Sequence, residues 1–173
     1  FNKFTKDKRA YIVAQLKKNS IIAEVGVWEG EFSKIIYDNA IPNKLILVDP
    51  WIFDPKIRGC APQVHGKEPL SQNFFDNAKL STYNKFKDVQ NVHIVDKVSS
   101  TASKLYDNEY FDYIYVDGEH SYKAVLNDLE NWYPKLKKNG KIFGDDFYWR
   151  EEDNSFSVKK AYYEFILKKN LID

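Results

Sequence analysis

The chain has 173 residues, of which 43% are hydrophobic and 16% aromatic, and its formal net charge is +1. A disordered chain would lack this apolar content, and so balanced a charge gives no reason to expect nucleic acid or an anionic membrane as a partner. No apolar run approaches the roughly 18 residues of a membrane span, so we expect a single soluble domain over residues 1–173.

The only cysteine bears on the cellular location. Cys60 has no partner for an internal disulfide, which is typical of a protein of the reducing cytoplasm, so a cytoplasmic location is expected. The sequence also contains no Met, even at position 1, which favours a trimmed chain that lacks elements at one end or the other.

The predicted elements alternate between short apolar segments and helical patterns. Near-continuous hydrophobicity, as in KLILVD, suits strands of a parallel sheet that is covered on both faces, and apolar residues three or four positions apart suit helices. In chain order we expect a helix over Tyr11–Lys18, a strand over Ser20–Val25, a helix after Gly30, strands over Lys44–Asp49, Val92–Asp96 and Phe111–Asp117, a helix from Val125 to Leu136 that Gly140 ends, a strand over Lys141–Gly144 and a helix over Phe156–Leu167.

This alternation predicts right-handed βαβ units and a doubly wound, Rossmann-like α/β fold with a mostly parallel sheet. The Pro- and Gly-containing segment 51–69 interrupts the pattern, and we expect an irregular loop there that serves as a lid or contacts substrate. In such sheets ligands bind outside the carboxyl ends of the strands, near the point where the strand order reverses. Each predicted strand ends at a candidate functional group, so the site is expected at that edge.

The first predicted strand leads into the loop EVGVWEG, in which Gly26 and Gly30 allow a tight turn and the close approach of a ligand. A dinucleotide site needs a further glycine between them at the pyrophosphate, and Trp28 holds that position, which counts against NAD or FAD. Asp49 ends the second strand, where an acid can bind ribose hydroxyls. The plainer alternative is that the glycines only shape a turn and Asp49 is a solvated strand end.

Three carboxylates follow two of the predicted strands. Asp117 ends FDYIYVD, and Asp145 and Asp146 follow KIFG, with no Lys or Arg immediately beside them. Adjacent strands lie about 4.8 Å apart, so these acids can converge on one cation. Hard oxygen donors suit Mg²⁺ (or Mn²⁺), and the lack of a Cys or His cluster argues against zinc. The alternative is that the acids merely face water.

His120 lies three residues beyond Asp117, on the turn that leads into the next helix. An imidazole with an ordinary pKa of about 6.5 can accept a proton near neutral pH. We therefore predict His120 as a general base, with Glu119 or Asp117 as the alternative base.

Together, the E-x-G-x-x-x-G loop, the acid after the next strand, and the DGEHSY and GDD motifs resemble a class I S-adenosylmethionine (SAM)-dependent methyltransferase. More narrowly, from about Ser20 to Phe147 the chain is similar to the small metal-dependent O-methyltransferases, including the macrocin and macrolide-sugar enzymes, with catechol O-methyltransferase as a more distant relative. The paired D-G-x-H and G-D-D motifs are the more specific part of this resemblance.

The resemblance implies cofactor contacts at several strand ends. The glycine loop would surround the methionine part of SAM, the acid after the second strand would hold the ribose, and the turns after the third and fourth strands would lie at the adenine. The resemblance places Glu24, Gly26 and Gly30 at the methionine part, Asp49 at the ribose, and Ser99 and Glu119 at the adenine.

The resemblance also implies the chemistry. Asp117, Asp145 and Asp146 would hold the metal, and a metal-bound hydroxyl of a sugar or other small polyol, possibly linked to a nucleotide, would give its proton to His120 and attack the methyl group of SAM. Asp117 would take part in this step. Two alternatives stay open: a Rossmann-type oxidoreductase that uses NAD, and a non-catalytic nucleoside-binding module of the same fold.

The methyltransferase sheet of this family has seven strands, and the sequence accounts for five of them. The last two strands are expected to be absent or cut off after the helix near residues 157–169. Their absence would leave an exposed sheet edge that needs a cover, so a homo-oligomer is one expected arrangement.

Overall fold

The computed structural model describes residues 3–56, 71–151 and 153–171. Most of the loop predicted over 51–69 lies outside these ranges, as does Cys60. The described part of that loop, residues 51–56, contains neither helix nor strand. Its role as a lid stays a prediction.

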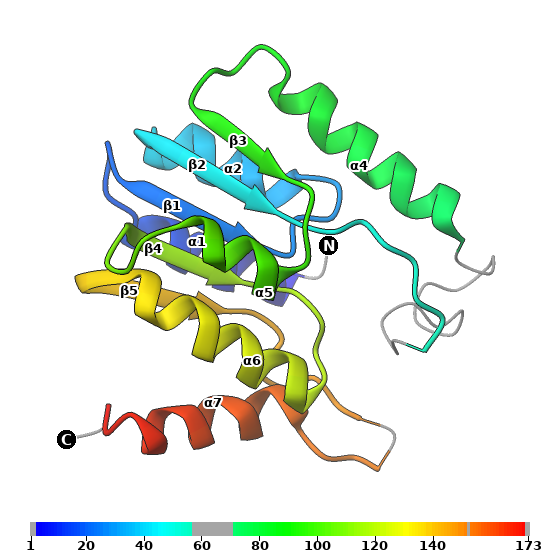
Figure 1. Ribbon diagram of the computed structural model, residues 1–173, viewed down its shortest axis with the longest axis vertical. Helices are drawn as coiled ribbons and strands as arrows, with labels where there is room; N and C mark the ends of the chain where they lie inside the picture. The colour runs from blue at the N-terminus through cyan, green and yellow to red at the C-terminus, as the bar shows by residue number, and fades with distance from the viewer. Residues whose placement is uncertain (1–2, 57–70, 152, 172–173) are drawn as a thin grey trace.

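The described residues form a five-stranded parallel sheet in the order β3-β2-β1-β4-β5 (Figure 1). The chain runs outward from β1 through β2 to β3 and then returns to the other side of β1 for β4 and β5, so the strand order reverses between β1 and β4. This confirms the predicted doubly wound α/β fold. The strands are β1 Ile21–Val25, β2 Lys44–Val48, β3 Val92–Val95, β4 Phe111–Val116 and β5 Leu136–Gly144.

Helices cover both faces of the sheet, and Figure 1 shows α7 outside α6, on which it packs. One face is covered by α1 Lys3–Gln15, α2 Glu31–Ala40 and α4 Gln72–Phe86, and the other by α5 Ser99–Ala102 and α6 Tyr122–Trp132, followed by α7 Ser157–Lys168.

Each face of the sheet has its own hydrophobic core, because successive side chains of a strand point to opposite faces. In β2, Leu45 and Leu47 pack with the α2 side, whereas Ile46 and Val48 pack with the α6 side. All four are buried, which explains why this strand has no polar alternation.

Two of the three helices on the α2 side of the sheet, α1 and α4, differ most from the predicted elements. α1 begins at Lys3 and ends at Gln15, whereas the sequence predicted a helix over Tyr11–Lys18. α4 was not predicted at all. The sequence of α4, QNFFDNAKLSTYNKF, has only a weak apolar period. Its residues Phe75, Ala78 and Phe86 are buried in the core on this side of the sheet, a contact that the sequence pattern of the helix does not indicate.

The predicted boundary between the helix and the fifth strand was wrong. α6 ends at Trp132 and passes into a short 3₁₀ turn, Tyr133–Lys135, because Pro134 has no amide hydrogen with which to continue the helix. β5 therefore begins at Leu136, and Gly140, predicted to end the helix, lies inside the strand.

Candidate active site

A cavity of about 470 Å³ opens at the carboxyl edge of the sheet, where the loops after β1 and β4 meet. A larger and more open hollow of about 770 Å³ lies along α7 and contains none of the predicted site residues. The cavity at the sheet edge is lined by six of them: Gly26, Asp49, Ser99, Asp117, Glu119 and His120. Glu24, Gly30, Asp145 and Asp146 lie outside its lining.

The loop after β1 crosses the loop after β4 at Gly26. Gly26 has φ +89°, and a Cβ atom there would lie 2.0 Å from the carbonyl oxygen of Asp117. Gly30, with φ +77°, precedes α2, and a Cβ there would meet the Thr82 side chain at 3.1 Å. Both glycines thus allow the loop after β1 to pack closely against neighbouring parts of the protein. Gly26 makes this close contact at the cavity wall.

Trp28 occupies the place where a dinucleotide site has its middle glycine. Its backbone adopts the left-handed conformation, with φ 56°. Its ring packs on Phe74 and Phe75, with centroids 5.3 and 5.1 Å away, and lines the cavity. A ring at this wall disfavours a pyrophosphate and therefore NAD.

Asp49 ties the loops after β1 and β2 together. Its carboxylate accepts hydrogen bonds from the backbone amides of Val27 at 2.9 Å, Trp28 at 3.0 Å and Trp51 at 2.8 Å. Burial raises the pKa of Asp49 above its ordinary value, although these three hydrogen bonds oppose the shift. Asp49 lines the cavity, and its contact with a ribose stays a prediction.

Glu24 is buried within β1, at 1% exposure, and the Ser33 hydroxyl donates to its Oε2 at 2.5 Å. Burial raises the pKa of Glu24 to about 8. Its carboxyl group therefore keeps its proton at neutral pH and holds α2 against β1. Its contact with the methionine part of SAM stays a prediction.

We expect the substitution Glu24→Gln to change how stability depends on pH. The unfolded chain releases this proton near pH 4.5 and the folded protein near pH 8. The wild type therefore loses stability as the pH rises between these values, by up to about 1.4 kcal/mol per pH unit. Urea unfolding at pH 5 and pH 8 should show a smaller loss in Glu24→Gln, with the exposed Glu31→Gln as the control. Parallel pH profiles of wild type and Glu24→Gln would contradict this account.

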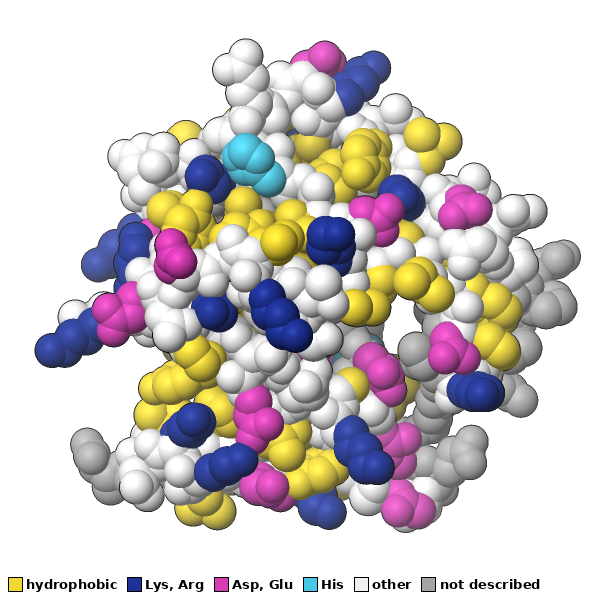
Figure 2. Space-filling model, in the orientation of Figure 1, with side chains coloured by type: hydrophobic (Ala, Val, Ile, Leu, Met, Phe, Trp, Pro, Cys, Tyr) yellow, Lys and Arg dark blue, Asp and Glu magenta, His cyan; other side chains and the backbone are white. Residues whose placement is uncertain are grey.

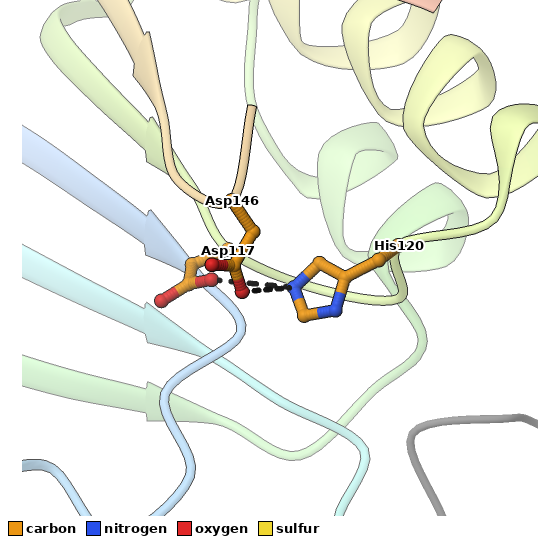
Figure 3. Close-up of side chains that lie close together, drawn as sticks. All are labelled: Asp117, His120 and Asp146. Carbon is orange, nitrogen blue, oxygen red and sulfur yellow. Dashed lines mark ion pairs between the residues drawn. The ribbon is translucent and has the colours of Figure 1, made fainter. Parts of the chain in front are cut away.

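Asp117, His120 and Asp146 point toward one another at the ends of β4 and β5 (Figure 3). Nε2 of His120 lies 3.5 Å from Oδ1 of Asp117 and 3.3 Å from Oδ2 of Asp146. This nitrogen is buried and has no well-formed hydrogen bond within the described part of the chain. Burial lowers the pKa of His120, but the neighbouring carboxylates outweigh this and raise it above its ordinary value.

Asp145 is engaged differently from the other two acids. Its Oδ1 accepts the amide of Asp146 at 2.8 Å, and its Oδ2 accepts the Tyr115 hydroxyl at 2.7 Å and Nε of Arg9 at 3.2 Å. Burial raises the pKa of Asp145, but these hydrogen bonds prevail and hold it below its ordinary value. Asp145 would have to exchange some of these bonds to bind a metal, and its role as a ligand stays a prediction.

Arg9 of α1 is a site residue that the sequence analysis missed. Its Nη2 lies 2.9 Å from Oδ2 of Asp117, and its guanidinium group lies 4.9 Å from the centre of the Phe32 ring. The three acids have no basic neighbour in the sequence, yet the fold brings one to them from 108 residues away. No local motif marks Arg9, because its position depends on how α1 packs against the sheet edge.

Ser99 and Asp128 form a pair at the cavity. The Ser99 hydroxyl donates to Oδ1 of Asp128 at 2.5 Å and accepts from the Trp132 indole at 2.7 Å. The sequence analysis missed Asp128, which lines the cavity from α6. The signal was present, because an acid stands here among the apolar residues of a helical stripe.

The sheet, with its strand-order reversal, the glycine loop after β1 and the acid after β2, has the architecture of class I SAM-dependent methyltransferases. A family model described as a methyltransferase domain matches residues 23–147, and the chain belongs to this family. No curated protein sequence matches the chain.

Solved structures share the fold at low sequence identity. The precorrin-8W decarboxylase of Methanobacterium thermoautotrophicum is 16% identical, with a TM-score of 0.63 over 94% of this chain and 70% of that one. A candidate rRNA methylase of Clostridium thermocellum is 13% identical, with a TM-score of 0.64 over 96% and 80%. A candidate methyltransferase of Streptococcus mutans in complex with SAH is 14% identical, with a TM-score of 0.63 over 97% and 83%. These likenesses bear on the fold alone.

Proposed function

We propose that this methyltransferase is a divalent-metal-dependent O-methyltransferase that acts on a hydroxyl group of a sugar or another small polyol, free or linked to a nucleotide. The observation that carries the proposal is the convergence of Asp117, His120 and Asp146 beside the cavity. The acceptor class rests on the resemblance of the DGEHSY and GDD motifs to the small metal-dependent O-methyltransferases.

The residues present fit a divalent cation. An oxygen atom of Asp117 and one of Asp146 lie within 4.8 Å of each other and of a ring nitrogen of His120. Carboxylate oxygens suit Mg²⁺ and Mn²⁺, so Asp117 and Asp146 would hold the cation while His120 serves as the base beside it. A bound cation would supply Lewis-acid stabilisation of negative charge on an oxygen atom.

The protein's own residues would position the two substrates and move one proton. Gly26 and Asp49 would hold the methionine and ribose parts of SAM at the cavity wall. His120 would accept the proton of the acceptor hydroxyl, because the carboxylates beside it stabilise the protonated imidazole. The new O–CH₃ bond forms as the S–CH₃ bond of the sulfonium breaks, and S-adenosylhomocysteine (SAH) is released.

Formation of SAH from SAM tests this proposal directly. The protein would be incubated with SAM and a panel of sugars and nucleotide sugars, with Mg²⁺, with Mn²⁺ or with a chelator. We expect one acceptor class to support turnover that the chelator abolishes and the metal restores. Turnover that is insensitive to the chelator would contradict the metal dependence.

We expect Arg9→Gln to weaken the fold and strengthen the response to metal. Removing the guanidinium group leaves two partly buried carboxylates without this counter-charge, which should cost about 1–3 kcal/mol of unfolding free energy. A cation can replace the lost charge, so Mn²⁺ should raise the melting temperature more in Arg9→Gln than in wild type. The exposed Lys17→Gln is the control. Equal Mn²⁺-induced shifts in wild type and Arg9→Gln would contradict competition between Arg9 and the metal.

The predicted partners and location remain proposals. None of the described helices is long and apolar enough to cross a membrane. On the face in Figure 2, basic and acidic side chains are interspersed, which suits a small-molecule acceptor better than nucleic acid. The cytoplasmic location still rests on the cysteine content, and a homo-oligomer on the sheet edge that β5 leaves unpaired within the described residues.

A further inference from the structure

Asp128 is an acid at a core position of α6. The buried residues of this helix are Val125, Asp128, Leu129 and Trp132, and Asp128 is only 6% exposed. A carboxyl group is rarely buried unless something binds it. Burial raises the pKa of Asp128 to about 6, so the group is mostly ionised at neutral pH and needs hydrogen-bond donors.

Only one oxygen of Asp128 has a hydrogen-bond donor among the described residues. Oδ1 accepts the Ser99 hydroxyl, whose own oxygen accepts the Trp132 indole. Oδ2 lies beside Gly118, where a Cβ atom would come within 3.3 Å of it, and receives no hydrogen bond from the described part of the chain. Asp128 and Gly118 both line the cavity, so Oδ2 is an acceptor available to a ligand.

The cavity lining near Asp128 combines apolar side chains with the carboxylate of Glu119, whose charge also raises the pKa of Asp128. Ala124 lies one helical turn before it on α6, and Val98 directly precedes its partner Ser99. Val48 and Ile52 contribute further apolar lining. A buried acceptor beside apolar side chains suits an aromatic heterocycle that carries an exocyclic amino group.

We propose that Oδ2 of Asp128 accepts a hydrogen bond from the 6-amino group of the SAM adenine, and that Ser99 is a positioning residue that holds Asp128 in place. This inference rests on the proposed function, since it requires SAM in the cavity. It also revises the adenine contact that the resemblance implied for Ser99, whose hydroxyl hydrogen is already donated to Asp128.

The 6-amino group distinguishes SAH from its 6-oxo analogue, S-inosylhomocysteine. A carboxylate accepts a hydrogen bond from the amino group but faces an acceptor, O6, in the analogue. A buried polar group left without its partner discriminates strongly, so wild type should bind SAH about 30-fold or more tightly than the analogue. In Asp128→Asn the amide can donate to O6 or accept from the amino group, and the ratio should fall below about threefold.

The experiment is calorimetric titration of the whole chain at pH 8 with SAH and with S-inosylhomocysteine. The control is Asp112→Asn, the same change in an acid at the amino end of β4, which should keep the wild-type ratio. Ser99→Ala should lower the ratio in part, and Ser99→Thr, which keeps the hydroxyl group, should restore it. A merely structural role of Asp128 would weaken both ligands equally and leave the ratio unchanged.

If Asp128→Asn fails to fold, the wild-type ratio together with the ratios of Ser99→Ala and Ser99→Thr still tests this inference. SAH binding with a wild-type ratio below about threefold, or a ratio that Asp128→Asn leaves unchanged, overturns this inference alone. No binding of SAH by the wild type overturns the proposed function and this inference with it.

Discussion

Replacing Asp146 by Asn should reduce methyl transfer by about 100-fold or more, while SAH affinity stays within about threefold of wild type. Asp146 faces His120 and Asp117 but does not line the cavity, so its loss should remove cation binding and spare the cofactor. Its side chain is 46% exposed, so we expect Asp146→Asn to fold normally and lost activity to reflect the site itself.

Initial rates with and without Mn²⁺, alongside SAH titrations, measure this effect. Asp107→Asn, an exposed acid in the connection that leads into β4, is the matched control and should keep full activity. Asp117→Asn should also lose activity, but it breaks the Arg9 ion pair as well and is the less specific variant. Unchanged rates in both Asp146→Asn and Asp117→Asn would rule out the metal mechanism.

The second large effect is expected at Gly26. Gly26→Ala would force a Cβ atom to within 2.0 Å of the Asp117 carbonyl oxygen and would strain a backbone with φ +89°. We expect a loss of about 3 kcal/mol or more of unfolding free energy, together with loss of SAH binding, because the loops after β1 and β4 must separate.

Gly30→Ala is the matched comparison for Gly26→Ala. Its backbone strain is similar, with φ +77°, but the nearest contact is the Thr82 side chain at 3.1 Å. A loss of about 1–2 kcal/mol is expected there, from the left-handed conformation. Equal losses in the two variants, measured by denaturant titration, would mean that backbone strain alone matters and that the loop crossing at Gly26 is not required.

Much of the fold could be predicted because it depends on local patterns. The run KLILV has no polar residue after Lys44, and this is the mark of a strand covered on both faces, as β2 is. Parallel strands also end at a common edge, so the convergence of Asp117 and Asp146 followed from their places at strand ends.

The features that were missed depend on distant contacts. The weak apolar pattern of α4 identifies a buried face only once the helix is seen to pack on the sheet. Arg9 reaches Asp117 only because α1 packs beside the strand ends. Asp128 is a different case, because its place in an apolar helical stripe was visible in the sequence. Its position at a cavity could not be predicted, because the loops after β1, β2, β3 and β4 form that cavity together.

The central claim is that the cavity at the carboxyl edge of the sheet binds SAM. Calorimetric titration of SAH into the protein, with Mg²⁺ and then with a chelator, and with NAD as the comparison ligand, tests this claim most directly. The account predicts micromolar binding of SAH under both conditions and no binding of NAD, because Trp28 lines the wall where a pyrophosphate would lie. Binding of NAD in place of SAH, or of neither ligand, would contradict it.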